Sequence, residues 1–437
     1  MKLFVPPLEI ADSEGFTDEK DIFKRKDFGE NLTNLIKSTD DAFVLAIDAP
    51  WGEGKTTFIK MWKGTLQQDN DMSCVLFDAF EHDYQQDPFL AIAREIYGLI
   101  GDEEVDLKED FKKKSSAAFK TIGRVAVRVG MKSLTAGILD ETVFEGSGAE
   151  DDISNTLDHY VAEQLESVKK DKESLEYFKT FLEELPQKLG SKKLVFIIDE
   201  LDRCRPPFAL EILEKIKHLF SVPNVVFVLS LNREQLEESI RCEYGRQVNA
   251  TQYLQKFINI WAHLPKLEDE YMNDAKQYIC KCLDVMDPMS DITMFRYNIQ
   301  ETLADLASYY HLSLRAIERV ITNLAILKNS RGELDAAYTR VSVYLAVIKV
   351  RYPSSYRQLA SGELSYSELL EVTELGDLKS KRSEDIPHGH HIKWTLFCFM
   401  STHEEIESFK SKNNFPKLDY YPTVDIGLLC KWMDTFQ

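Results

Sequence analysis

Short runs of apolar residues, each closed by polar or turn-forming residues, recur along the first part of the chain and predict buried β-strands. Between these runs, apolar residues return every three or four positions, which is the spacing of an amphipathic helix. Strands that alternate with helices form a parallel sheet with helices on both faces. The predicted strands are 42–48, 73–79, 192–199, 224–231 and a short fifth at 260–265, and the clearest helices among them are 27–38, 88–100 and 207–220.

Residues 1–20, which precede this alternation, are predicted to form an irregular arm. The alternation itself is interrupted once and ends before the C-terminal part of the chain. The stretch between the second and third strands is charged, helix-prone and too long for one crossover connection, which indicates an insertion. Beyond residue 266 the strand signal fades and helical spacing takes over, most clearly at 310–328. The predicted domains are the two parts of an α/β core, 1–100 and 191–266, a helical insertion, 101–190, a helical domain, 267–370, and a mixed C-terminal region of unknown role, 371–437.

Composition narrows the class of protein. The chain has 53 basic and 73 acidic residues, a net charge of −20, so its overall field does not attract nucleic acid. Its seven cysteines lack the spacing of a disulfide framework, and the N-terminal residues lack the apolar core of a signal peptide. No uncharged apolar run reaches the ~18 residues that a transmembrane helix needs. We therefore expect a reduced, cytoplasmic protein without a transmembrane segment.

One segment of the predicted insertion, 111–132, carries positive charge at helical spacing. Charge at this frequency forbids a bilayer-spanning helix. Packing against the acidic remainder of the protein is the plainest interpretation, and contact with a membrane surface, with nucleic acid or with an acidic partner remains open. The residues that line this basic face recur every four positions: Lys120, Arg124, Arg128 and Lys132.

The first strand leads into a glycine-containing loop, APWGEGKTT, which is followed by a helix. The loop fits the phosphate-binding pattern G-x-x-x-x-G-K-[ST], except that Ala49 replaces the first glycine. Glycines let backbone N–H groups turn toward a polyphosphate, and the helix N-terminus adds partial positive charge. Lys55 should reach the β- and γ-phosphates, and Thr56 should ligate Mg²⁺. The predicted nucleotide-binding residues are Ala49, Pro50, Trp51, Gly52, Glu53, Gly54, Lys55, Thr56 and Thr57.

The third strand ends in adjacent carboxylates, at the edge of an open α/β sheet where ligands bind. Asp199 would hold Mg²⁺ directly or through water, and Glu200 would polarise the attacking water, with Asp202 as the alternative. The strand at 73–79, between the two motifs, suggests a P-loop NTPase of the additional-strand class with a catalytic glutamate. The predicted cofactors are ATP and Mg²⁺, although the sequence does not distinguish ATP from GTP.

The two motifs, APWGEGKTTF and VFIIDELDRCRP, resemble those of the KAP family of P-loop NTPases. Three further segments are similar to the family: LFDAFEHDYQQDPF at 76–89, QYLQKFINIWAHLP at 252–265 and LSLRAIERVITNL at 312–324. The resemblance covers roughly residues 20–350. Many members of the family carry transmembrane helices between the two motifs, and this chain departs from that pattern.

The resemblance implies an ATPase core covered by a helical lid and assigns roles to three more residues. Asn232 would sense the γ-phosphate, Arg315 would contact phosphate from the lid, and Arg203 would stabilise transferred charge within one chain or across a subunit boundary. Each residue also has a structural interpretation. Asn232 could cap a helix, Arg315 could be a solvated helix residue, and Arg203 could pair with Asp202 or a neighbouring carboxylate.

The leading functional hypothesis is a Mg²⁺-dependent ATP hydrolase that acts as a switch. The nucleotide state would change the lid and thereby its contact with another copy of the chain or with a partner protein. The resemblance implies a role in bacterial conflict systems such as phage or plasmid exclusion. The alternatives are an ATP-dependent assembly scaffold with little turnover, a nucleic-acid-dependent ATPase that uses the basic helix, and a small-molecule kinase, which the DELDRC motif disfavours.

Overall fold

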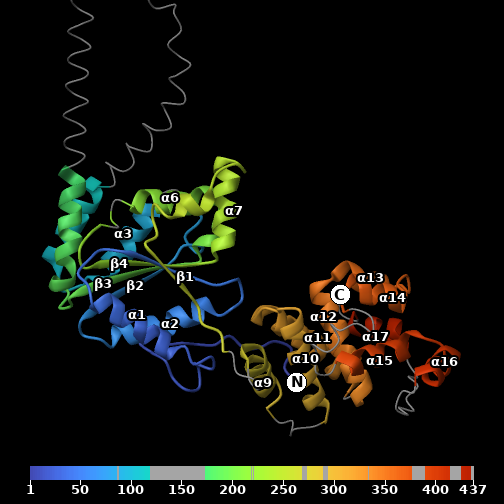
Figure 1. Cartoon of the computed structure of the whole chain (residues 1–437). Coiled ribbons are helices and arrows are strands. Elements are labelled where there is room, and N and C mark those ends of the chain that lie inside the picture. The colour runs from blue at the N-terminus through green and yellow to red at the C-terminus, as the bar shows by residue number, and fades with distance from the viewer. Residues whose placement is uncertain are drawn as a thin grey trace, which may run out of the picture.

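The chain forms an α/β lobe and a helical lobe, which lie side by side in Figure 1. The basic face of the predicted helix at 111–132 falls outside the residues described here. A computed structural model describes residues 1–85, 88–118, 173–217, 219, 221–267, 273–288, 294–332, 334–375, 389–413 and 425–434.

The α/β lobe is built on a five-stranded parallel sheet with the order β2-β3-β4-β1-β5, so β4 lies between the strands that carry the two motifs. All five predicted strands are confirmed within two residues at each end. Every residue of β3 and β4 is buried, as expected for strands covered on both faces. The strands are β1 (Val44–Asp48), β2 (Met72–Asp78), β3 (Lys193–Asp199), β4 (Val225–Leu231) and β5 (Ile260–His263).

Helices cover the two faces of the sheet and enclose a separate hydrophobic core on each side (Figure 1). One face holds α1 (Lys26–Lys37) and α2 (Lys55–Gln67). The other holds α3 (Pro88–Leu99), α6 (Pro206–Ile216), α7 (Arg233–Tyr244) and α8 (Ala250–Leu254). Two helical stretches at 105–118 and 173–188, the described ends of the predicted insertion, join this second core through Phe111 and Phe178.

The helical lobe packs around α12 (Ala336–Arg351), whose residues 341–348 are all buried. Helices α15 (Gly389–Met400) and α17 (Ile426–Met433), from the predicted C-terminal region, bury Leu396 and Leu429 in the same core. Within the described ranges, no helix combines the length and the apolar character needed to cross a bilayer. The other helices of the lobe are α9 (Asp274–Met286), α10 (Met294–Tyr309), α11 (Leu314–Arg331), α13 (Pro353–Ala360), α14 (Tyr366–Val372) and α16 (His403–Asn413).

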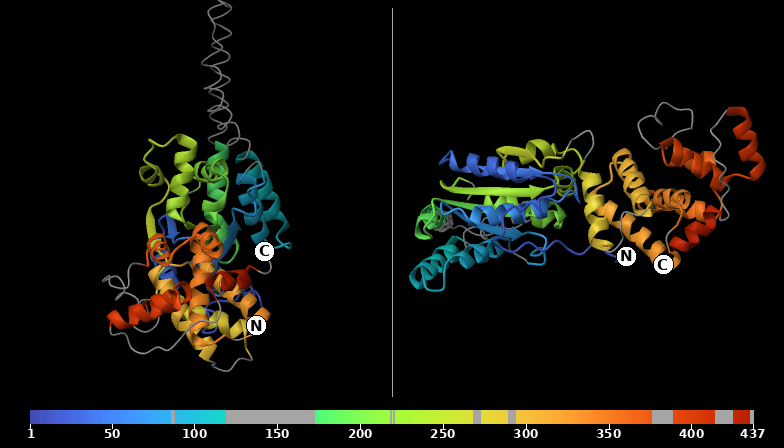
Figure 2. Two further views of the ribbon diagram at one scale, coloured as in Figure 1. Left: turned by 90° about the vertical axis from the view of Figure 1, so that its right-hand side faces the viewer. Right: turned by 90° about the horizontal axis from the view of Figure 1, so that it is seen from below.

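An extended N-terminal segment, residues 1–24, contains no helix or strand, which confirms the predicted irregular arm. We term this segment the strap. It starts beside the helical lobe and runs back to the α/β lobe, as the right-hand view of Figure 2 shows. The two lobes are therefore joined twice, by the strap and by the connection that follows β5.

Candidate nucleotide-binding site

The loop between β1 and α2 has the backbone shape that its glycines predict. Gly52 and Gly54 adopt left-handed φ angles of +81° and +79°, a conformation that other residues adopt only with strain. Helix α2 begins at Lys55, directly after Gly54, and no described side chain caps it. The N–H groups of its first turn therefore lack a side-chain cap, which is the state in which a helix N-terminus can receive an anion.

Lys55 lies within this loop and is only 9% exposed. Its Nζ donates to the carbonyl oxygens of Ala49, at 2.5 Å, and Pro50, at 3.1 Å. Burial lowers the pKa of Lys55, and the nearby carboxylates, Asp202 foremost, oppose that shift. Because both of these acceptors are neutral carbonyl oxygens, a phosphate could replace them without having to break an ion pair.

The acidic strand ends opposite the first turn of α2. Asp199, the last residue of β3, is 2% exposed, and burial raises its pKa. Glu200 follows with a left-handed φ of +60° and starts the short 3₁₀ turn η2 (Leu201–Arg203). The Thr56 hydroxyl lies 3.4 Å from Glu200 Oε1, and it is near enough to Asp199 to lower the pKa of that carboxyl against the effect of burial. The fold thus brings Thr56 and Asp199, the predicted Mg²⁺ ligands, to the same place.

The two candidate catalytic carboxylates have different partners. Glu200 is half-buried and pairs with Arg203 Nη1 at 2.6 Å. Burial raises the pKa of Glu200, and the charge of Arg203 counteracts the shift. Asp202 is 6% exposed and accepts a hydrogen bond from the indole N–H of Trp51. Arg203 therefore pairs with a neighbouring carboxylate, and that carboxylate is Glu200.

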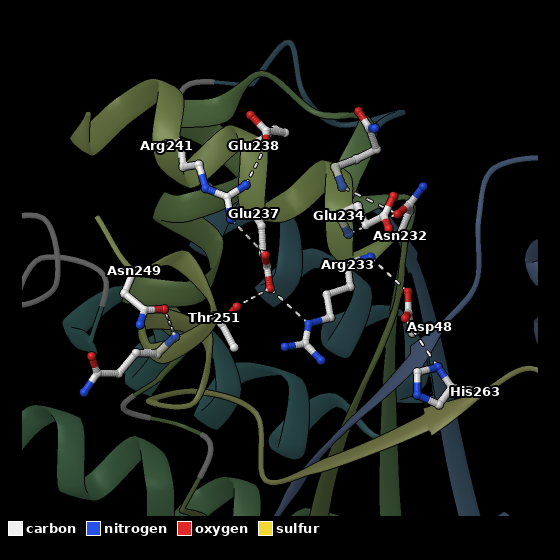
Figure 3. A network of polar contacts seen from close by, with 12 residues as sticks. Asp48, Asn232, Arg233, Glu234, Glu237, Glu238, Arg241, Asn249, Thr251 and His263 are labelled. Atoms are coloured by element: carbon white, nitrogen blue, oxygen red, sulfur yellow. Dashed lines mark hydrogen bonds and ion pairs between the residues drawn. The ribbon is translucent and has the colours of Figure 1, made fainter. Parts of the chain in front are cut away.

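Asn232 follows β4 and caps α7, as its structural interpretation expects. Its Oδ1 accepts from the backbone N–H groups of Glu234, at 3.1 Å, and Gln235, at 3.5 Å. The start of α7 is also tied to β1, because Asp48 Oδ1 accepts from the Arg233 backbone N–H at 2.9 Å (Figure 3). In the same network, Glu237 accepts from the side chains of Arg233, Arg241 and Thr251.

A cavity of about 340 Å³ lies where the phosphate loop, the acidic turn, the helical lobe and the strap meet. Five of its lining residues are Lys55, Thr56, Asp199, Glu200 and Arg203, so the residues predicted from the two motifs face one space. Arg315 lines it from α11, and the Leu314 backbone N–H donates to Gly52 O at 3.1 Å. Asn232 lies outside the lining.

Sequence reasoning missed several residues around this cavity. Arg25 is 2% exposed, and its guanidinium donates to Glu53 O at 2.9 Å, Pro265 O at 3.0 Å and Asp274 Oδ2 at 3.2 Å. It therefore links the phosphate loop to the connection after β5 and to α9. A lone arginine at a helix start gives no sequence signal. Phe23 of the strap and Tyr278 of α9 also line the cavity without having been predicted.

The family model of the KAP family P-loop domain matches residues 25–331, more than half of the chain. The chain belongs to the KAP family. The family and the P-loop α/β fold that the motifs of this KAP protein indicated are therefore both confirmed. The matched region begins at Arg25 and ends with α11, so it includes every element that lines the cavity except the strap before residue 25.

Comparisons beyond the family are remote, and no curated protein matches the chain. The KAP protein is similar to the solved ORC2 protein of Aeropyrum pernix in ADPNP–ADP complexes, at 12% identity and a TM-score of 0.36, over 94% of this chain and 93% of that one. It is also similar to closed-state Hsp104 with ATPyS and FITC casein, at 12% identity and a TM-score of 0.32, over 86% and 50%. Neither likeness is close enough to carry an argument about function.

Proposed function

We propose that this KAP protein binds ATP with Mg²⁺, hydrolyses it, and uses the change of nucleotide as a switch between its two lobes. One observation supports the proposal above all others. Thr56 and Glu200, 144 positions apart in the chain, lie in contact at a cavity that also holds Lys55 and the uncapped N-terminus of α2. An anion-binding helix end opposite buried carboxylates is the arrangement that a metal–triphosphate complex requires.

The residues present fit ATP and Mg²⁺. The left-handed glycines and the first-turn amides of α2 would hold phosphate oxygens, and Lys55 would offset their charge. Thr56 and Asp199 would hold the metal, since a hydroxyl and a carboxylate are ligands that Mg²⁺ prefers. Bound Mg²⁺ supplies charge neutralisation at the β- and γ-phosphates. Asp199 would then be ionised by the cation, even though burial alone raises its pKa.

Glu200 is the stronger candidate for the residue that orients and deprotonates the attacking water. Glu200 contacts Thr56, which is itself a proposed metal ligand, whereas Asp202 accepts a hydrogen bond from Trp51. Its present partner, Arg203, would have to move away before Glu200 could act as a base. Once released, Arg203 could turn toward the developing negative charge, which is the role that the family resemblance implies.

The contact between α11 and the phosphate loop gives the switch a route to the helical lobe. Leu314 is hydrogen-bonded to Gly52, and a Cβ atom on Gly52 would lie 3.1 Å from the Arg315 Cβ. Loss of the terminal phosphate would remove the negative charge that Arg315 could contact from α11. The receiver would be a second copy or a partner protein, within a bacterial phage- or plasmid-exclusion system in the cytoplasm.

The decisive experiment measures nucleotide binding and phosphate release separately. Wild type should release phosphate from ATP only with Mg²⁺, and Lys55→Ala should lose both activities. Glu200→Gln should bind ATP as wild type does while turnover falls at least about 100-fold, the usual contribution of a general base. Phosphate release that survives Lys55→Ala would refute the proposal, and competition with GTP would give the base preference.

The Arg203–Glu200 pair also favours a second candidate, an ATP-dependent scaffold with little turnover, because a paired glutamate is a poor base. The scaffold predicts negligible phosphate release by wild type and an ATP-dependent increase in mass that persists in Glu200→Gln. The switch predicts that the assembly of wild type decays as ATP is consumed, whereas that of Glu200→Gln persists. Mass measured over time in ATP therefore separates the two.

A further inference from the structure

The strap contacts α2 so closely that two glycines are required. Gly64 lies inside α2, and a Cβ atom at this position would fall 2.1 Å from the Glu14 carbonyl oxygen. A Cβ atom on Gly15 would lie 2.7 Å from Thr65 Oγ1. Because glycine destabilises a helix interior relative to alanine, Gly64 carries a cost that the approach of the strap explains.

Further contacts hold the middle of the strap in place. Asp12 pairs with Lys63 at 3.0 Å, and Gln68 donates to Ser13 O at 2.8 Å, both from the α2 side. The ring of Phe16 lies 5.7 Å from that of Phe58, centre to centre, and packs over Gly29 of α1. The strap is therefore docked on the helix that begins at the phosphate loop.

On either side of this anchor, the strap contacts the helical lobe and the cavity. Lys2 N–H donates to Met286 O of α9 at 2.7 Å. Leu8, Ile22 and Phe23 line the cavity, and the Phe23 ring lies 6.2 Å from the ring of Tyr278 on α9. The strap thus forms one wall of the cavity while it bridges the two lobes.

The lining of the cavity combines two kinds of chemistry. Lys55 and the α2 N-terminus provide positive charge, whereas Phe23 of the strap and Tyr278 of α9 add aromatic rings. The Phe23 ring borders the phosphate loop, with Cε2 3.9 Å from a Cβ atom placed on Gly54. A nucleoside triphosphate carries both a charged phosphate chain and a planar base. An aromatic wall suits that base.

We propose that the strap is the nucleoside-binding wall of the site, so that strap docking on α2 and nucleotide binding stabilise each other. The inference rests on the proposed function, because it takes the ligand to be a nucleoside triphosphate. Coupling of this kind is reciprocal: nucleotide protects the strap, and undocking the strap weakens nucleotide binding by the same factor.

Gly64→Ala tests the proposal by undocking the strap without touching a cavity residue. We expect the Kd for ATP with Mg²⁺, measured by calorimetry, to rise at least about tenfold, and KM to rise with kcat nearly unchanged. In wild type, ATP should slow trypsin cleavage after Lys20 and Lys24. In Gly64→Ala, that cleavage should be fast with or without ATP.

Gly98→Ala is the matched control. Gly98 lies inside α3, and a Cβ atom there meets nothing within 4 Å. We expect this variant to bind ATP as wild type does and to show the wild-type cleavage pattern. A second route avoids the risk that Gly64→Ala does not fold. Gly15→Ala should weaken ATP binding, and adding Thr65→Ala, which removes the atom that Gly15→Ala would meet, should restore it.

The outcomes separate this inference from the proposed function. If Gly64→Ala and Gly15→Ala bind ATP as tightly as wild type, while Lys55→Ala does not bind it, the strap has no part in the site and the proposed function stands. If wild type itself binds no nucleotide, the proposed function fails and the inference fails with it. Trypsin cleavage of wild type at the same rate with and without saturating ATP would also overturn the inference.

Discussion

Asp199 is a proposed metal ligand and is almost completely buried. Burial disfavours its charged form, whereas a bound cation would favour it. Burial raises its pKa, so the folded chain holds this proton more tightly than the unfolded chain does. The stability that the protonated form contributes is complete at low pH and is lost as pH rises through the folded-state pKa. Above that folded-state pKa, the nucleotide-free protein therefore bears the cost of a buried charge.

Replacing Asp199 with Asn removes that cost and the proposed metal ligand together. We expect nucleotide-free Asp199→Asn to unfold at a higher temperature than wild type at about pH 8, by roughly 1–3 °C. The difference should shrink at a lower pH, because a fall through the raised folded-state pKa protonates the wild-type carboxyl. ATP with Mg²⁺ should stabilise wild type but not the variant. Thermal unfolding at both pH values, with and without nucleotide, measures this.

The exposed carboxylate of Asp41 provides the control, and Asp41→Asn should match wild type under every condition. If Asp199→Asn keeps the full stabilisation by ATP with Mg²⁺, then Asp199 does not hold the metal. An equal unfolding temperature for Asp199→Asn and wild type at both pH values would show that burial of this charge has no net cost.

At the level of single residues, local patterns predicted the part of the site that two short motifs encode. The left-handed glycines, Lys55 at the start of α2 and the carboxylates at the end of β3 all lie where the sequence indicated. Arg25 could not be predicted, because its partners Glu53 and Asp274 are 28 and 249 positions away. No local pattern reveals contacts of that range.

Helix α7 allows its capping residue to be separated from the proposed phosphate sensor. A serine side chain can still cap the helix with its hydroxyl oxygen, but it has no amide group. An alanine side chain has neither a capping oxygen nor an amide group. We expect Asn232→Ala to lower the free energy of unfolding by about 1 kcal/mol and Asn232→Ser to lower it by much less. If Asn232 also senses phosphate, both variants should lose at least about tenfold in kcat. Urea unfolding and steady-state kinetics on the two variants give both quantities.

Wild-type turnover in Asn232→Ser would contradict the sensor role and leave Asn232 as a cap alone. Asn232 does not line the cavity, so the sensor role requires it to act on the phosphate from outside the lining, and normal turnover would be enough to reject that role. Ser313, the N-cap of α11, provides the reference for a helix cap beside the site. The comparable variant Ser313→Ala should lose stability of the same order, about 1 kcal/mol.

Whole elements were predictable where apolar residues have a clear period or a clear end. The five strands are apolar runs ended by turn residues, and all five were predicted. Helix α15 was not, because residues 392–399 are buried on nearly every side. Its buried residues are apolar except for Lys393 and Thr395, so no polar face repeats at helical spacing, and periodicity alone cannot distinguish such a stretch from a strand. The strap has no period at all, so only its irregularity was predicted.

For the whole molecule, the sequence predicted a core and a helical domain but not how they meet. The cavity is formed by the phosphate loop, the acidic turn, α9, α11 and the strap, which come from widely separated parts of the chain. Their meeting depends on side chains that bridge the lobes. From a buried position, Arg25 donates to Asp274 of the helical lobe, and also to the phosphate loop and to the connection after β5. The joint stability of the two lobes should therefore depend on this residue.

Removing Arg25 should uncouple the lobes. The Arg25 side chain is 3% exposed, so Arg25→Met leaves Asp274 buried without its cation and two carbonyl oxygens without this donor. Breaking a buried ion pair from one side costs about 3–5 kcal/mol. We expect calorimetry to show one unfolding transition for wild type and two for Arg25→Met, with the helical lobe unfolding at the lower temperature. The KM for ATP should also rise, because Arg25 would no longer hold the phosphate loop through the Glu53 carbonyl oxygen.

Arg205 offers a matched control, since its backbone N–H and guanidinium also make three hydrogen bonds, all to Asp83, but its side chain is 63% exposed. Solvent screens that pair, so Arg205→Met should cost no more than about 1 kcal/mol and leave a single transition. If Arg25→Met also unfolds in one transition at the wild-type temperature, then Arg25 does not couple the lobes. The hydrogen bond between Leu314 and Gly52 and the contacts of the strap would then have to join them without it.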